Sequence, residues 1–354
     1  MTALKDKLRR QITSTGPISL AAYMNLCLTD PEHGYYTTRD PLGQDGDFTT
    51  APEISQMFGE LIGLCLAQTW IDRGAPTPFV LAELGPGRGT LMGDLLRATQ
   101  NIPGFHDAMT LHLVDTSPAL RAIQKNTIPK ALQHHSSITE LPDGPLFLVA
   151  NEFFDSLPIR QFQRVEDRWR ERVVGLKGDA LALGLTDPMS QEHLAHRLLD
   201  TRDGDIVEVS ASGQNIAKTL GARIASQGGV ALIVDYGGWR SLGDTFQAVR
   251  GHEVTDPLDA PGAADLTAHV DFEALAEAAK PAAASQMVTQ GVFLERLGIT
   301  ARAELLAKGL RDDALRSHIA AHRRLTHPEE MGTLFKVMAL YEPGTPCPPG
   351  VEPA

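Results

Sequence analysis

A glycine-rich turn, Gly85-Pro86-Gly87-Arg88-Gly89, directly follows the short apolar run at 79–84. Glycine lets a backbone bend sharply and approach a ligand closely, and the helix that follows such a turn points its N-terminus at that ligand. Several classes of nucleotide-containing ligand bind in this way, and in other proteins such a turn has only a structural role. The turn therefore predicts a ligand site or a tight bend, and the residues around it decide between them.

Two carboxylates near the turn favour S-adenosylmethionine over a dinucleotide. Glu83 precedes the first glycine by two residues and could accept a hydrogen bond from a ligand ammonium group, which a pyrophosphate lacks. Asp115 ends the next apolar run, where a carboxylate can bind both hydroxyls of a ribose. Residue 90 is Thr, so the third glycine of a GxGxxG fingerprint is missing, and a pyrophosphate would prefer a glycine loop without a nearby anion. We therefore predict an S-adenosylmethionine site that contains Glu83, Gly85, Pro86, Gly87 and Asp115.

The segment Asn151-Glu-Phe-Phe-Asp-Ser-Leu-Pro158 follows a third apolar run. In open α/β sheets, ligands bind at this end of the strands. Methyl transfer needs an acceptor lone pair in line with the sulfonium, and a carboxylate that fixes a guanidinium supplies this orientation. Glu152 is the first candidate for a catalytic residue, Asp155 the second, and Asn151 belongs to the same reacting loop. The alternatives are a helix cap at Asp155 and a solvated loop charge at Glu152.

Two further motifs give less specific candidates. In GDFTTAPE, residues 46–53, we assign Asp47 and Thr50 to the cofactor site. The alternative is a plain helix start, with Thr50 as the cap and Glu53 completing a capping box. Acceptor contacts are assigned to His269 and Asp271 in ADLTAHVDF and to Tyr36 in GYYTT, although a lone histidine more often has a structural role.

Four short apolar runs must position these residues: 79–84, 111–114, 145–150 and 230–234. Each ends at or beside a carboxylate or in the Glu-Leu-Gly turn, and helical spacing of apolar residues follows the glycine turn. Strands that are buried on both faces give such continuous apolar runs in parallel sheets. The predicted fold class is therefore α/β, with a Rossmann-like sheet.

The pattern changes along the chain divide it into four segments. Residues 1–45 predict an N-terminal helical cap, and residues 46–158 predict the S-adenosylmethionine-binding core. Alternating polar and apolar residues after Ile159 indicate a β-hairpin in an inserted lobe at 159–228. Residues 229–345 predict the rest of the core with substrate-side loops. Within that segment, residues 238–267 are rich in Gly, Asp and Pro and predict a surface loop.

Composition limits the class of protein and its partners. The 354 residues are 42% hydrophobic and 21% charged, as in ordinary globular proteins, and the net charge of −12 argues against nucleic-acid binding. The three cysteines form no CxxC pair and lack the spacing of a zinc site, so no metal is expected and a reducing compartment fits. No run reaches the roughly 18 apolar residues of a membrane span, and the N-terminus lacks a secretory signal. These features predict a cytoplasmic protein.

Seven motifs, in chain order, closely resemble the MidA-like family of protein arginine methyltransferases, which is related to the mitochondrial assembly factor of respiratory complex I. They are GYYTT, GDFTTAPEISQMFGE, ELGPGRGTL, NEFFDSLPIRQF, LIVDYG, DLTAHVDF and MGTLFKV. The resemblance runs from about Pro31 to Val337, nearly the whole chain.

The resemblance implies a class I methyltransferase fold, S-adenosylmethionine as cofactor, and symmetric dimethylation of an arginine in the large subunit of NADH dehydrogenase, which supports assembly of that complex. Where the family usually has Glu after the second strand, this chain has Asp115, which keeps the carboxylate but shortens its reach. The alternatives are a non-catalytic assembly chaperone that binds S-adenosylmethionine and a nicotinamide-dependent oxidoreductase. A homodimer is left open, as are the acceptor protein and its methylation state.

Overall fold

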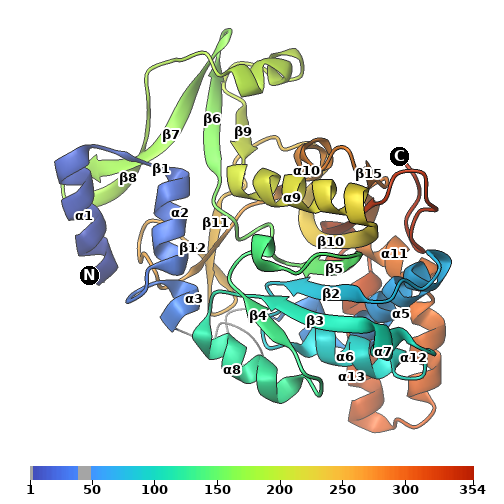
Figure 1. The fold of residues 1–354 in the computed structure, drawn as a ribbon. Coiled ribbons are helices and arrows are strands. Elements are labelled where there is room, and N and C mark those ends of the chain that lie inside the picture. The colour runs from blue at the N-terminus through green and yellow to red at the C-terminus, as the bar shows by residue number, and fades with distance from the viewer. Residues whose placement is uncertain (1–2, 39–48) are drawn as a thin grey trace.

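The computed structural model describes residues 3–38 and 49–354 of the chain, and a central β-sheet organises them (Figure 1). Five of its strands run parallel: β2 (Phe79–Leu84), β3 (Met109–Val114), β4 (Gln133–His135), β5 (Leu146–Asn151) and β10 (Gly229–Gly238). β17 (Phe335–Tyr341) pairs antiparallel with β10. The short strands β15 (Ala283–Ala284) and β16 (Val288–Thr289) pair with β17, and β14 (Val270–Asp271) pairs with β10. The resulting order is β15-β17-β10-β5-β2-β3-β4.

Helices cover both faces of this sheet. On one face Phe79 and Leu81 of β2 join a core with α5 (Gln56–Asp72), α6 (Thr90–Thr99), α7 (Phe105–Ala108), α11 (Gln290–Arg296), α12 (Ile299–Ala307) and α13 (Asp312–Thr326). On the other face Val80 and Ala82 join a core with α9 (Ala211–Gln227) and α10 (Phe272–Ala278). Successive side chains of a strand point to opposite faces, so one apolar run supplies both cores. α8 (Pro118–Thr127) connects β3 to β4, and α14 (Met331–Leu334) precedes β17.

A break in the helical backbone precedes the long helix α5. Ser55 has extended backbone angles and separates α4 (Ala51–Ile54) from α5. Its hydroxyl accepts a hydrogen bond from the Met57 N–H at 3.3 Å and so caps α5. Gly63 lets α5 approach α6 closely, since a Cβ there would lie 2.9 Å from the Leu95 Cα. Among the described helices, none has the length and apolarity that crossing a membrane requires.

The N-terminal helices and the inserted lobe share a separate core. α1 (Ala3–Thr15) buries Leu4, Leu8 and Ile12, and it is followed by α2 (Leu20–Thr29) and α3 (Tyr35–Thr38). The lobe contains β6 (Arg160–Val165), β7 (Arg168–Lys177), β8 (Ala180–Leu185), β9 (Ile206–Val209) and the 3₁₀ helix Glu192–Leu199. Another 3₁₀ helix, Ile138–Glu140, precedes β5 and packs with the central sheet. β1 (Ile18–Ser19) pairs with β7 and joins this sheet in the order β1-β7-β6-β9. The α/β sheet, helical cap and β-rich lobe confirm the predicted fold class, and the residue bounds predicted for the four segments stay predictions.

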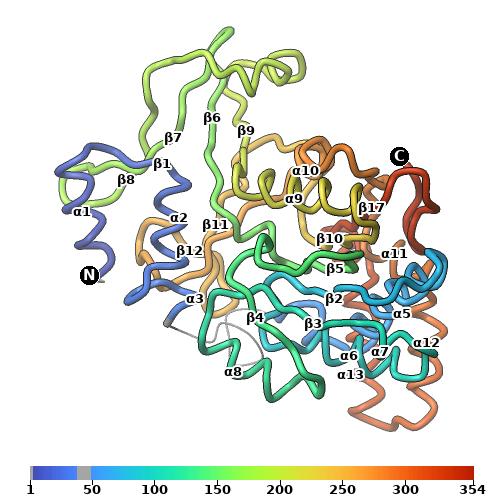
Figure 2. The backbone as a smooth tube through the Cα atoms, in the orientation of Figure 1, coloured from blue at the N-terminus to red at the C-terminus, as the bar shows by residue number. Residues whose placement is uncertain are grey.

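The segment predicted as a surface loop at 238–267 forms a small antiparallel sheet instead. Its strands are β11 (Gln247–Arg250), β12 (Glu253–Thr255) and β13 (Asp265–Thr267), in the order β12-β11-β13. Strands of three or four residues are too short to give a recognisable alternation, which explains why the pattern was not visible in the sequence. β13 contacts α2, and in Figure 2 the backbone of this segment runs between the cap and the central sheet.

Candidate functional site

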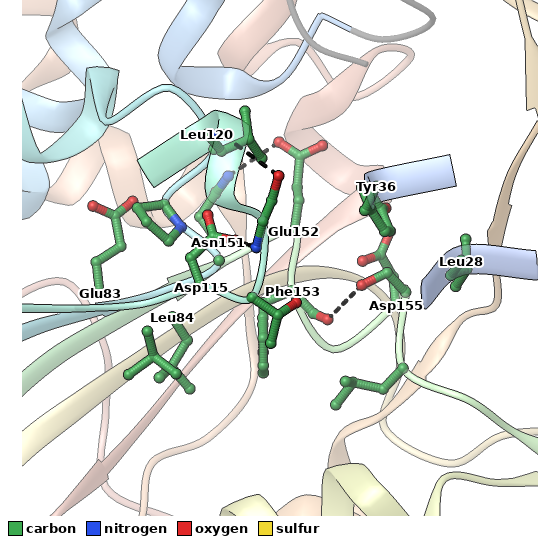
Figure 3. Close-up of a pocket in the computed structure, with 18 of the residues that line it drawn as sticks. Leu28, Tyr36, Glu83, Leu84, Asp115, Leu120, Asn151, Glu152, Phe153 and Asp155 are labelled. Atoms are coloured by element: carbon green, nitrogen blue, oxygen red, sulfur yellow. Dashed lines mark hydrogen bonds between the residues drawn. The ribbon is translucent and has the colours of Figure 1, made fainter. Parts of the chain in front are cut away.

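A cavity of about 510 Å³ lies at the carboxyl ends of β2, β3, β5 and β10. In Figure 3, Glu83, Leu84 and Asp115 lie on one side of it, Leu28, Tyr36 and Asp155 on the other, and Asn151, Glu152 and Phe153 between them. The cavity brings together ten of the predicted site residues: Tyr36, Thr50, Glu83, Gly85, Pro86, Gly87, Asp115, Asn151, Glu152 and Asp155.

The glycine turn forms one wall of the cavity with its backbone. Gly85, Gly87 and Gly89 have φ values of +59°, +52° and +83°, in the left-handed region that favours glycine. A Cβ at Gly85 would lie 2.9 Å from Cδ2 of Phe153, closer than real Cβ atoms come. The turn therefore leaves room that any larger residue would fill, and a ligand can approach its backbone.

Glu83 is a buried carboxyl group with an unsatisfied oxygen. Its side chain lines the cavity and is only 3% exposed, and its Oε2 has no hydrogen-bond partner among the described residues. Burial, with a smaller effect from the Asp115 charge, raises the pKa of Glu83 to about 8. A cationic ligand group next to Glu83 would satisfy this oxygen and restore the charged form. This fits the ammonium group of S-adenosylmethionine.

Asp115 is held in place from two sides. Its Oδ1 accepts a hydrogen bond from the Ser117 N–H at 2.8 Å, and its Oδ2 accepts one from Gln124 Nε2 at 2.7 Å. Gln124 Nε2 also donates to the Gly87 carbonyl at 2.7 Å and so ties the glycine turn to Asp115. Gln124 was not predicted from the sequence. The available signal was a polar residue four positions after the buried Leu120, on the same face of α8.

Glu152 lies at the centre of the cavity, directly after β5, with φ +51° in the left-handed region. Its Oε1 accepts hydrogen bonds from the Ala51 N–H at 3.0 Å and from Asn151 Nδ2 at 3.1 Å. Burial raises the pKa of Glu152 to about 7, although the Ala51 N–H partly offsets this. The Asn151 Oδ1 is buried without a hydrogen-bond partner among the described residues. The neighbouring pair thus presents acceptor atoms to the cavity.

Asp155 and a second buried carboxyl, Asp235, organise the rest of this loop. Asp155 is 6% exposed, and its Oδ1 has no hydrogen-bond partner in the described part of the chain. Burial raises the pKa of Asp155 to about 6, and an interaction with Tyr236 partly offsets this increase. Asp235 Oδ2 accepts the backbone N–H groups of Phe153, Phe154 and Asp155 at 3.2, 2.9 and 3.3 Å. Asp235 therefore fixes the loop that carries the candidate acids. The sequence showed it as a carboxylate at a strand end, but no role was assigned.

The GDFTTAPE motif is only partly described. Asp47 lies outside the described residues. Thr50 lines the cavity and is the N-cap residue of α4, but its side chain makes no capping hydrogen bond. Glu53 does not complete a capping box, because its Oε1 accepts the Thr90 hydroxyl at 2.5 Å. Thr50 is therefore placed as a cavity residue rather than as a side-chain cap.

The structure does not bring His269 and Asp271 to this cavity. The His269 ring packs edge-on against Tyr236, with ring centroids 5.5 Å apart, and Tyr236 lies between it and the cavity. The Asp271 carboxylate caps α10 by accepting the Ala274 N–H and also accepts the Ser241 N–H. Both side chains therefore make structural contacts. Tyr36, the third predicted acceptor contact, does line the cavity.

The chain is similar to known methyltransferases over most of its length. The family model described as that of an S-adenosyl-L-methionine-dependent methyltransferase matches residues 61–291. The mitochondrial protein arginine methyltransferase NDUFAF7 of Xenopus laevis is 39% identical over 368 residues, covering 96% of this chain and 84% of the relative. The Homo sapiens protein of that name is 36% identical over 370 residues, covering 96% and 83%.

A solved structure is similar over nearly the whole chain. A Burkholderia thailandensis protein bound to S-adenosyl-homocysteine superimposes with a TM-score of 0.82 at 27% identity, covering 98% of this chain and 94% of that one. It supports the class I methyltransferase fold and the cofactor predicted from the glycine turn.

The predicted cytoplasmic location is wrong, because the named relatives are mitochondrial proteins. Reduced cysteines fit more than one compartment and cannot identify one. On its sequence, fold and site, the chain belongs to the MidA-like family of S-adenosylmethionine-dependent methyltransferases.

Proposed function

We propose that this chain transfers a methyl group to an arginine side chain of a protein. The observation that carries the proposal is one cavity with three buried carboxyls: Glu83 on one side, with an oxygen that has no partner among the described residues, Glu152 at the centre and Asp155 on the far side. Two cationic groups can therefore be held in one enclosed space. The relatives' name, protein arginine methyltransferase, supports arginine as the acceptor.

The donor side consists of the residues around the glycine turn. When bound there, S-adenosylmethionine supplies a methyl group on a positively charged sulfur. Glu83 would hold the ammonium group, Gly85, Pro86 and Gly87 would pass close to the ligand, and Asp115 would bind the ribose hydroxyls. Gln124 and the Ser117 N–H keep Asp115 in place for this contact. Thr50, and Asp47 from the sequence, complete the proposed donor site.

The acceptor side uses the loop after β5. Glu152 and Asp155 would bind the guanidinium and hold one terminal nitrogen toward the donor, which supplies orientation. Oε1 of Glu152 already accepts hydrogen bonds from the Ala51 N–H and Asn151 Nδ2, so Oε2 would be the atom that binds the acceptor. The nitrogen that gains a methyl group must lose a proton. With a pKa near 7, Glu152 Oε2 is suited to accept that proton.

The acceptor protein and the methylation state are proposed from the motif resemblance. We propose symmetric dimethylation of an arginine in the large subunit of NADH dehydrogenase, with the protein supporting assembly of that complex. The alternative is a chaperone that binds both cofactor and partner without reaction.

The test combines methylation with binding for wild type and Glu152→Gln. Lysate from cells lacking the gene is incubated with purified protein and deuterium-labelled S-adenosylmethionine, and mass spectrometry locates the label. We expect label on arginine with wild type, and loss of at least about a hundredfold in rate with Glu152→Gln at unchanged S-adenosyl-homocysteine affinity. Label on another residue type would disprove arginine as the acceptor. No label with wild type, despite binding, would favour the chaperone.

A further inference from the structure

The side of the cavity away from Glu83 is built by segments far apart in the sequence. Tyr36 comes from α3 of the helical cap, and Asp265 comes from β13. Asp265 is 6% exposed and Thr267, on the same strand, is 3% exposed, yet both line the cavity. These side chains face an enclosed space and are not part of the outer surface.

Hydrogen bonds join these segments to the loop that carries Asp155. The Tyr36 hydroxyl donates to Asp265 Oδ1 at 2.8 Å. The Ala268 N–H, just after β13, donates to the Asp155 carbonyl at 3.0 Å. The Tyr236 side chain interacts with the Asp155 carboxyl and with Thr267. The position of Asp265 relative to Asp155 is therefore fixed by backbone and side-chain contacts.

The described side chains on this side of the cavity carry negative charge. Among the described residues that line the cavity, Arg88 is the single lysine, arginine or histidine, and it belongs to the glycine turn. Asp155 Oδ1 is buried without a hydrogen-bond partner in the described chain. Burial of the Tyr36 hydroxyl raises its pKa, and the negative charges of Asp265 and Asp155 raise it further. Tyr36 thus stays a neutral donor, and it lies beside two carboxyl groups of the cavity wall, those of Asp155 and Asp265.

We infer that Asp265, oriented by Tyr36, is a further acceptor-binding residue that acts with Asp155 on the guanidinium. This rests on the proposed function. A guanidinium presents five N–H donors in a planar fork, so carboxylates on different sides can bind different edges of it. Glu152 would then take the reacting nitrogen while Asp155 and Asp265 bind the remaining donors. An ammonium group has no such separated edges, so this arrangement favours arginine over lysine.

The inference is tested by peptide binding with saturating S-adenosyl-homocysteine. The probes are acetyl-Gly-Arg-Gly-amide and its citrulline counterpart, which has nearly the same shape but no charge, and affinity is measured by calorimetry. We expect wild type to prefer the arginine peptide and Asp265→Asn to bind it at least about tenfold more weakly. Tyr36→Phe should give a smaller loss. S-adenosyl-homocysteine affinity should stay within about twofold in each variant, which also reports correct folding.

Asp259→Asn is the matched control, because Asp259 is an exposed aspartate between β12 and β13 and does not line the cavity. It should behave as wild type. Unchanged arginine preference in Asp265→Asn would overturn the inference while leaving the proposed function intact. If Asp265→Asn fails to fold, Tyr36→Phe decides, and wild-type peptide affinity in that variant would overturn it. A wild type that does not distinguish the two peptides would overturn the proposed function, and the inference with it.

Discussion

Carboxyl groups with raised pKa values lie along the cavity from the donor side to the acceptor side. Burial raises the pKa of Glu83 to about 8, of Glu152 to about 7 and of Asp155 to about 6. A buried, incompletely paired carboxyl destabilises the folded protein, and such groups concentrate at functional sites. In the free protein near neutral pH, protons partly neutralise this cluster. Cationic ligands would displace those protons when they bind.

Glu83 should make donor binding depend on pH. Below pH 8 its carboxyl is protonated in the free protein and must lose that proton to pair with an ammonium group. We expect the affinity for S-adenosyl-homocysteine to rise with pH between 6 and 8, by up to about tenfold per unit, and proton release to be visible by calorimetry in buffers of different ionisation enthalpy. Glu83→Gln should bind more weakly and lose this pH dependence.

The stability of the same variant provides an independent check. The folded-state pKa of Glu83 is raised, so its contribution to stability is fully present below about pH 4.5 and is lost as pH rises through 8. Glu83→Gln should therefore raise the Tm of the ligand-free protein by a few degrees at pH 8.5 and leave it nearly unchanged at pH 4.5. A variant with unchanged pH dependence of binding and of Tm would show that Glu83 is not the titrating group.

Sequence reasoning identified cavity residues that stand beside a single strand end, and missed residues whose contacts depend on several segments. Glu83, Asp115 and Glu152 stand beside strand ends, and the carboxyl edge of a parallel sheet brings such positions together. Gln124 gains its role only from contacts to Asp115 and Gly87, which the fold creates. Spacing along one chain cannot show such convergence.

At the scale of elements, four of the five parallel strands were predicted from their buried apolar runs, whereas β4, which has no buried residue, was missed. The apolar runs at 79–84 and 145–150 correspond to β2 and β5, in which every residue is buried. The pairing of β1 with β7 could not be predicted, since it joins two residues of the cap to a strand far along the chain. The three strands between 247 and 267 were hidden by their short length.

The turn between β2 and α6 should tolerate no side chain at Gly85. In Gly85→Ala the Cβ would meet Phe153 and the residue would keep a positive φ, so either Phe153 or the turn must move. We expect S-adenosyl-homocysteine affinity to fall by at least about tenfold, because a shift of this size misplaces the backbone beside the ligand.

Gly16→Ala separates strain from site geometry. Gly16 has φ +84° and no atom within 4 Å of its Cβ position, so the substitution strains the backbone without a clash. It should lower the free energy of unfolding by about 1 kcal/mol, the cost of a left-handed alanine, and lower the Tm accordingly, with wild-type ligand affinity. Equal loss of ligand affinity in both variants would show that the effect of Gly85→Ala is a general loss of stability.

At the scale of the whole molecule, the two sides of the cavity belong to different hydrophobic cores. Glu83 and Asp115 extend from the central sheet, whose cores include β2 and β5. Tyr36 and Leu28 belong to the core shared by the cap, β7 and β13. Donor binding therefore depends on the cores of the central sheet, whereas acceptor binding depends on them through the loop after β5 and also on the core of the cap. Weakening one core should affect the two ligands unequally.

Leu8→Ala tests this separation. Leu8 is fully buried in the cap core and does not line the cavity, and its truncation should destabilise that core by about 2–5 kcal/mol. Hydrogen exchange should then accelerate at residues 3–38 while β2 and β5 stay protected. The arginine peptide should bind more weakly, because Tyr36 and its contact to Asp265 depend on the cap, whereas S-adenosyl-homocysteine affinity should stay within about twofold.

Leu95→Ala, in the core between α5, α6 and the sheet, should instead weaken binding of S-adenosyl-homocysteine. If Leu8→Ala accelerates exchange in β2 and β5 as much as in the cap, the cap and the central sheet unfold as one cooperative unit, and the two ligands cannot be separated in this way.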